Sequence, residues 1–226
     1  MELQESEIQK EPKQNNQFPF LTIWLHPKKT LRFLLDTNPD KHVILLSIIQ
    51  GVFCILYWAN MELLGDMFPF HLWRQVLLFV GIGSMIGPIR MYLYSFLYQW
   101  IGSRFGGKGR IRELRTAFAW SSAPYLLGLP IWLFLILHVG HYLFGDTTPY
   151  MRTIMHVAYE PLFISLVLLV FWRIILLTIH LAEAHQLSFF KSIAIVLPLS
   201  YADLMLNLFV INTARSIFHS FASLST

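Results

Sequence analysis

The chain has 226 residues, of which 55% are hydrophobic and only 13% are charged, with a net charge of +4. A soluble globular domain has about 25% charged residues, and long apolar runs recur along this chain, so the composition excludes a soluble domain and predicts an integral membrane protein. The positive charge does not indicate a nucleic-acid partner, because the charges cluster beside the apolar runs, where anionic lipid headgroups attract them.

The N-terminal region divides into two parts. Residues 1–17 are polar and mixed in charge, without the basic and apolar stretches of a cleavable signal peptide, so we expect a disordered cytoplasmic tail. Residues 18–41 mix apolar and basic residues and are too short and too charged to span a bilayer. They predict an interfacial amphipathic helix that starts near Pro27. A simple membrane anchor and a docking surface for a partner both fit this segment.

Five apolar runs follow that are long enough to cross a membrane as helices. They cover about residues 43–59, 76–100, 118–144, 157–181 and 193–211. The predicted fold is therefore all-α, a polytopic membrane helix bundle with about five transmembrane helices and an N-terminal interfacial helix. The bundle occupies residues 42–215, and a short C-terminal tail is expected at residues 216–226.

Lys and Arg are distributed unevenly between the two sides of this bundle. Twelve of the 17 lie before the first span or in the loops after the second and fourth spans, and three lie on the other side. Because cytoplasmic loops carry the excess of Lys and Arg, the N-terminus is predicted to be cytoplasmic and the C-terminus to lie outside.

The loop between the second and third spans is basic and rich in glycine, which permits a tight turn. We expect this loop to dock a partner, together with residues 18–36. The residues assigned to the docking loop are Arg104, Gly106, Gly107, Lys108, Arg110, Arg112 and Arg115.

Charged residues also fall within the predicted spans, namely Arg90, Glu160, Arg173 and Asp203. An arginine near the membrane centre costs at least about 2.5 kcal/mol by insertion scales. We predict that Arg90 pairs with Asp203, because both lie near mid-depth. The pair fits a proton or ion site, and it also fits a structural contact that fixes helix packing. A later start of the second span, with Arg90 reaching the interface, is the alternative.

Prolines and glycines are expected to affect the geometry and the packing of these spans. A proline removes a helix hydrogen bond, and broken helices near mid-membrane mark substrate sites in transporters. Helix breaks or kinks are predicted at Pro88, Pro124, Pro130 and Pro198. Gly83 and Gly87 have the spacing that lets two helices approach closely.

No motif indicates catalysis or a cofactor. The chain has a single cysteine, Cys54, and lacks a His-Glu-x-x-His sequence, a phosphate-binding loop and a nucleophile elbow. Several histidines near the ends of the spans have spacings seen in metal sites, but interfacial histidines usually serve as amphipathic lining. We therefore expect no enzymatic activity, no cofactor and no metal site.

Three stretches carry a resemblance to a known family. They are Ile23-Trp-Leu-His-Pro-Lys-Lys-Thr-Leu-Arg-Phe-Leu-Leu, then Phe105-Gly-Gly-Lys-Gly-Arg-Ile-Arg-Glu-Leu with the following Ala119-Trp-Ser-Ser-Ala-Pro, and finally His185-Gln-Leu-Ser-Phe-Phe-Lys. Over roughly residues 20–215 the chain resembles the Yip1-domain membrane proteins, in particular their bacterial branch. The resemblance implies a five-helix membrane domain with a cytoplasmic N-terminus and no catalytic residues.

The same resemblance bears on function. Eukaryotic Yip1-domain members act in trafficking and engage small GTPases of the Rab type, but this chain lacks the Asp-Leu-Tyr-Gly-Pro signature that those members carry. Some bacterial relatives resemble accessory subunits of membrane transport systems.

We expect a non-enzymatic multi-pass protein of a bacterial inner membrane that acts as an accessory or scaffold subunit of a membrane transport or trafficking system. The expected partners are membrane lipids and another integral membrane protein or transporter complex, with a homo-oligomer also open and no nucleic acid. The alternative is a small transporter or lipid-handling permease that uses the mid-membrane polar site.

Overall fold

The computed structural model describes residues 19–68, 70–145 and 149–224. Five segments are long and apolar enough to cross a membrane, and the described residues contain no strand. The segments are α3 (Val43–Met61), α4 (Leu72–Arg104), α6 (Tyr125–Val139) with the 3-10 turn η2 (Gly140–Leu143), α7 (Pro149–His185) and α8 (Phe189–Leu224). The predicted all-α membrane bundle is confirmed. The tail expected at residues 1–17 lies outside the described residues.

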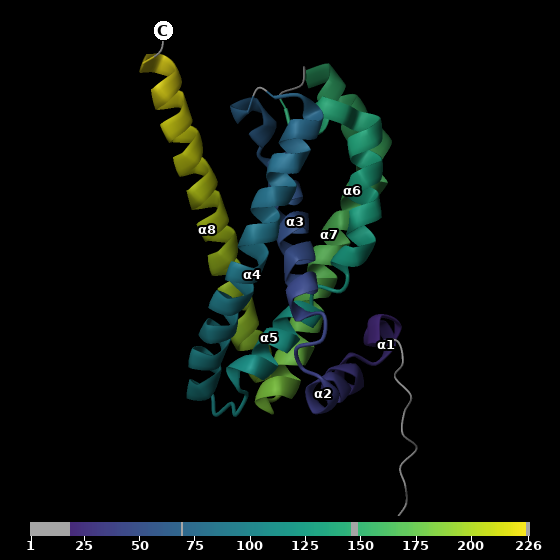
Figure 1. The fold of residues 1–226 in the computed structure, drawn as a ribbon, viewed down its shortest axis with the longest axis vertical. Helices are drawn as coiled ribbons and strands as arrows, with labels where there is room; N and C mark the ends of the chain where they lie inside the picture. The colour runs from purple at the N-terminus through teal and green to yellow at the C-terminus, as the bar shows by residue number, and fades with distance from the viewer. Residues whose placement is uncertain (1–18, 69, 146–148, 225–226) are drawn as a thin grey trace, which may run out of the picture.

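Short helices gather at one end of this bundle. Figure 1 shows α1 (Pro19–Leu25), α2 (Pro27–Thr37) and α5 (Ile111–Trp120) at the end where α4 finishes. The turn between α7 and α8 lies at the same end, and α8 diverges from the other helices toward its C-terminus. We call the end that carries α1, α2 and loop 105–110 the basic end.

Helix α2 begins at Pro27, as the sequence predicts, because proline fits the first turn of a helix. Its buried residues Thr30, Leu31 and Leu34 face the bundle, where α2 packs against α5 and α7. Arg32 on α2 forms an ion pair with Glu183 on α7. Protein therefore covers much of the apolar face that the sequence assigned to the membrane interface.

The third predicted span begins in the wrong place. Residues 118–120 end helix α5, and the membrane segment starts only at Tyr125. Phe118 and Trp120 are buried inside the protein, and the indole nitrogen of Trp120 donates a hydrogen bond to the carbonyl of Lys41 at 3.0 Å. The apolar run at 118–120 was misread because a buried helix and a lipid-facing helix have the same composition.

Two further boundaries differ from the prediction. Helix α4 begins at Leu72 rather than near residue 76. Helix α8 continues to Leu224, so most of the predicted short tail at 216–226 is helical. The residues after 211 are more polar, but polarity does not end a helix without a cap or a proline.

Three of the four prolines at the predicted helix breaks do not interrupt their helices, and whether they kink them stays a prediction. Helices α4, α6 and α8 continue through Pro88, Pro130 and Pro198, and only Pro124 lies at a boundary, directly before α6. One proline removes a single backbone donor, and the hydrogen bonds of the neighbouring turns keep the helix continuous.

Helices α3 and α4 pack closely through glycines. A Cβ atom on Gly83 would lie 2.6 Å from the Cα of Val52, and one on Gly87 would collide with the carbonyl of Ser47. Gly51 of α3 faces the same contact from the other side. The close approach expected from Gly83 and Gly87 is therefore confirmed, and its partner is α3.

Candidate functional site

A cavity of about 480 Å³ lies between helices α3, α4, α7 and α8, and it combines charged groups with aromatic rings. Its polar lining residues are Gln50, Cys54, Glu62, Arg90, Arg173, Ser200, Asp203 and Asn207. Its aromatic lining residues are Phe53, Tyr57, Trp58, Tyr94, Tyr98, Phe118 and Tyr125. A volume of this size falls in the range of pockets that hold small molecules.

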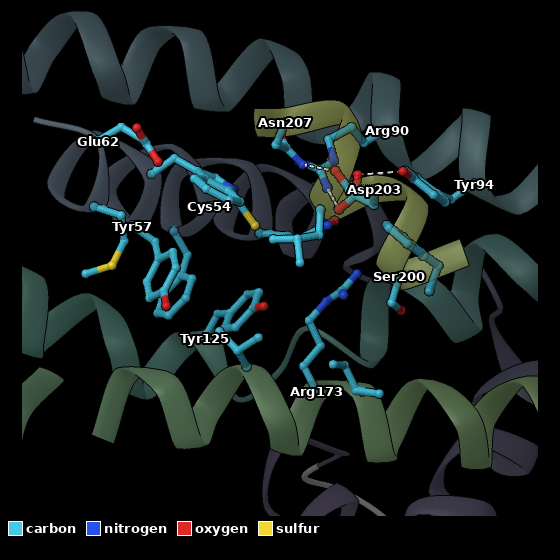
Figure 2. A pocket seen from close by; sticks show the side chains of 18 of the residues that line it. Cys54, Tyr57, Glu62, Arg90, Tyr94, Tyr125, Arg173, Ser200, Asp203 and Asn207 are labelled. Carbon is cyan, nitrogen blue, oxygen red and sulfur yellow. Dashed lines mark hydrogen bonds and ion pairs between the residues drawn. The ribbon is translucent and has the colours of Figure 1, made fainter. Parts of the chain in front are cut away.

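The predicted contact between Arg90 and Asp203 is present and joins α4 to α8. The guanidinium of Arg90 forms an ion pair with the Asp203 carboxylate, and the Tyr94 hydroxyl donates to the other carboxylate oxygen. Arg90 also donates to the side-chain oxygen of Asn207 at 3.4 Å. Figure 2 shows these four side chains pointing toward one another at one side of the cavity.

This cluster lies deep within the bundle. Arg90 is about 21 Å along its helix from Arg104, and Asp203 is about 21 Å from Phe189, at 1.5 Å per residue. The side chain of Arg90 is 15% exposed and that of Asp203 is 24% exposed. The structure thus favours a central pair over an arginine that extends to the membrane interface.

Arg173 reaches the cavity from α7, and no carboxylate pairs with it among the described residues. Its Nε donates to the Ser122 hydroxyl at 3.3 Å, and its guanidinium carbon lies 5.0 Å from the centre of the Phe118 ring and 5.8 Å from that of Tyr125. These contacts orient the side chain without neutralising its charge. The fourth predicted polar residue, Glu160, is exposed on α7 and does not line the cavity.

Sequence reasoning missed several cavity residues. Tyr94 lies four residues after Arg90, and Asn207 lies four residues after Asp203, so helical spacing could have placed each beside its charged neighbour. Gln50 gave no such signal. It is 1% exposed, and its side-chain oxygen has no hydrogen-bond partner within the described structure.

The glycine-rich loop 105–110 is ordered by His185, the last residue of α7. The Gly109 amide donates to Nδ1 of His185 at 3.2 Å, and Nε2 of the same ring donates to the Tyr98 carbonyl at 3.1 Å. The Lys108 amide donates to the His185 carbonyl at 3.1 Å. A Cβ atom on Gly107 would lie 2.5 Å from Nδ1 of His185, so the glycines make room for this ring.

The basic residues of the predicted docking loop do not form one group. Arg112 forms an ion pair with Asp40, and its hydrogen bond holds the pKa of the Asp40 carboxyl below the usual value of 3.8. The guanidinium carbon of Arg115 lies 5.2 Å from the centre of the Tyr92 ring.

Three other cations are exposed, and none takes part in an ion pair within the described part of the chain. These are Arg104, Lys108 and Arg110.

Comparison with known protein families identifies the family to which this chain belongs. The Yip1 domain model matches residues 21–211. The chain belongs to the Yip1 domain family. A comparison with curated proteins and a comparison with solved structures each find no match.

The Yip1 domain includes the predicted docking loop, the Arg90–Asp203 pair and Arg173. The Yip1 family is not known for enzymatic activity. Among residues 19–68, 70–145 and 149–224, no group of three or more His, Cys, Asp or Glu side chains could hold a metal ion. The distinguishing features of the cavity are its charged side chains and its aromatic walls.

Proposed function

We propose that this Yip1-domain protein is a non-enzymatic accessory or scaffold subunit of a membrane transport or trafficking system. In this proposal it lies in a bacterial inner membrane with its basic end in the cytoplasm, where that end binds an acidic surface on another integral membrane protein. The observation that carries the proposal is the ordered loop 105–110 with the exposed cations Arg104, Lys108 and Arg110.

Order and charge together support binding at this end. A loop already held by His185 loses little conformational freedom when a partner binds, so less of the contact energy is lost to ordering. Exposed cations also attract an acidic surface and increase the association rate. Arg112 is neutralised by Asp40, and Arg115 is half-buried beside Tyr92, so we assign these two residues to structure rather than to docking. The guanidinium carbon of Arg104 lies 4.4 Å from the centre of the Trp100 ring, but Arg104 stays exposed and without an ion pair among the described residues.

The test neutralises the three docking cations while keeping the membrane orientation. Since Lys and Arg counts determine topology, both proteins to be compared carry Gln4→Lys, Gln14→Lys and Gln17→Lys in the N-terminal tail. One of them also carries Arg104→Gln, Lys108→Gln and Arg110→Gln.

Each tagged protein is purified from its native membrane in a mild detergent, and the accompanying integral membrane proteins are quantified. We expect the neutralised loop to reduce recovery of a stoichiometric partner at least tenfold. Equal recovery from the two proteins would refute the docking surface.

The cavity supports a second candidate function, a small transporter or lipid-handling permease. Its polar cluster lies at mid-depth beside aromatic walls, as expected for a site that passes a charged group through a bilayer. In proteoliposomes with fluorescent lipids, a permease should expose inner-leaflet lipid to an added quencher, and Asp203→Asn should abolish this exposure. A wild-type protein that leaves the inner leaflet protected would remove this candidate.

A further inference from the structure

We propose that the cavity binds the headgroup of an anionic amphiphile, with Arg173 receiving the anionic group and the apolar tail leaving past Met61 and Leu204. This binding site goes beyond docking at the basic end. It would serve equally an accessory subunit that needs a bound lipid and a permease that moves one.

The balance of charge in the cavity selects an anion. Arg90 and Arg173 supply two positive charges from α4 and α7, whereas Asp203 supplies one negative charge and is already paired with Arg90. The other carboxylate of the lining, on Glu62, pairs with Arg215 of α8. Among the residues that the structure describes, the guanidinium of Arg173 therefore has no counter-ion.

The position of Arg173 suits a bound anion. The rings of Phe118 and Tyr125 lie beside its guanidinium, and Ser122 accepts a hydrogen bond from its Nε. Within the described residues, its two terminal nitrogens keep their donors for a ligand. A guanidinium presents paired donors that match the oxygens of a phosphate or a carboxylate. Figure 2 shows Arg173 extending from α7 toward the cavity between Tyr125 and Ser200.

The size of the cavity and the apolar residues at its edge favour an amphiphile over a small hydrophilic ion as the ligand. About 480 Å³ exceeds what a lone phosphate fills, since a single water takes about 30 Å³ of liquid. Two of the lining residues, Met61 and Leu204, are 41% and 40% exposed, so the cavity reaches the surface of the bundle past apolar side chains. Both belong to segments long and apolar enough to cross a membrane: Met61 is the last residue of α3, and Leu204 lies within α8 directly after Asp203.

An unused acceptor indicates that the ligand also carries a hydrogen-bond donor. Gln50 lines the cavity, and its buried side-chain oxygen has no hydrogen-bond partner within the described structure, although buried polar atoms are normally satisfied. A headgroup that joins a phosphate to a hydroxyl-bearing alcohol supplies both an anion and a donor. We therefore choose phosphatidylglycerol as the probe.

The experiment measures the melting temperature of the full chain in a neutral maltoside detergent. The added probes are dioctanoyl phosphatidylglycerol, dioctanoyl phosphatidylcholine and sodium phosphate, at matched concentration and ionic strength. Phosphatidylglycerol at a tenfold excess over its Kd should raise the melting temperature by about 3–5 °C. The other two probes should raise it by less than about 1 °C. Equal shifts with the zwitterionic lipid, or with phosphate alone, would overturn the proposal.

Variants then assign the site. Arg173→Gln should weaken phosphatidylglycerol binding at least tenfold, as counted by native mass spectrometry of the retained lipid, and Arg173→Lys should restore part of it. Arg74→Gln removes an exposed arginine that belongs neither to the cavity lining nor to the docking loop, and it should leave binding unchanged.

If Arg173→Gln does not fold, Leu204→Trp tests the site instead. The larger side chain should block the apolar edge of the cavity without changing a charge. Loss of binding in that variant supports the cavity site. Phosphatidylglycerol binding that is retained in Arg173→Gln overturns the cavity site. If Arg173→Gln does not fold, retained binding in Leu204→Trp overturns it.

Discussion

The ion pair between Arg90 and Asp203 offers the sharpest test of how the helices are held together. We expect Asp203→Asn and Arg90→Gln each to destabilise the bundle, and the double variant to lose less stability than the two single losses added together. Each single substitution leaves a polar partner at mid-depth without its counter-charge, whereas the double substitution removes both charges.

The size of the effect follows from burial. Removing one member of a fully buried pair costs about 3–5 kcal/mol. Arg90 and Asp203 keep 15% and 24% of their side-chain surface exposed, so we expect about 2–3 kcal/mol for each single substitution. Polar contacts between membrane helices have coupling energies up to about 1.7 kcal/mol, and we expect about 1–2 kcal/mol here. At about 2–4 °C per kcal/mol, Asp203→Asn should lower the melting temperature by about 4–12 °C.

The assay is reversible unfolding in detergent, by titration with sodium dodecyl sulfate, of the wild type, both single variants and the double variant. Glu160→Gln is the matched control, because this carboxylate is exposed and lies away from the cavity. It should change the stability by less than about 0.5 kcal/mol. Additive effects of the two single substitutions would show that the pair does not couple α4 to α8, and the reasoning would be wrong.

Three further predictions concern packing, the loop and pH. Gly83→Ala should lower the melting temperature by several degrees because its Cβ meets α3, whereas Gly81→Ala has nothing within 4 Å and should leave stability unchanged or higher; equal melting temperatures would contradict the close contact. His185→Ala should speed hydrogen exchange of the loop 105–110 amides at least tenfold, and unchanged exchange would remove the ordering role. The lowered pKa of Asp40 means that its pair with Arg112 stabilises the fold above about pH 4, and the benefit is lost as pH falls through that pKa. Denaturant titrations should therefore separate wild type from Arg112→Gln at pH 7, and the difference should shrink as the pH falls below about 4.

The span pattern could be predicted because each crossing needs a long apolar run, and lipid imposes that requirement on every helix. Depth within the runs also sufficed to pair Arg90 with Asp203, since only residues at similar depth can meet. The start of the third span could not be predicted. Phe118 and Trp120 are apolar because α5 is buried in protein, and composition does not separate protein from lipid as the surrounding medium.

The contacts that order loop 105–110 could not be predicted from the sequence either. The glycines of loop 105–110 indicate a turn, but the ring that fills the space beside them comes from His185, about 80 residues later in the chain. Arg173 illustrates the same difficulty. Its depth could be inferred, but the absence of a counter-charge among the described residues depends on how α7 and α8 separate around the cavity.

The measurement that most directly tests the central claim is a quantitative comparison of what accompanies the protein out of its native membrane. The two proteins share the three added tail lysines and differ only in the charges of Arg104, Lys108 and Arg110. We predict that an integral membrane partner accompanies the protein with wild-type loop charges in a fixed ratio and is lost from the protein with the neutralised loop. Recovery of both proteins without a protein partner, as a monomer or homo-oligomer with bound lipid, would contradict the accessory role.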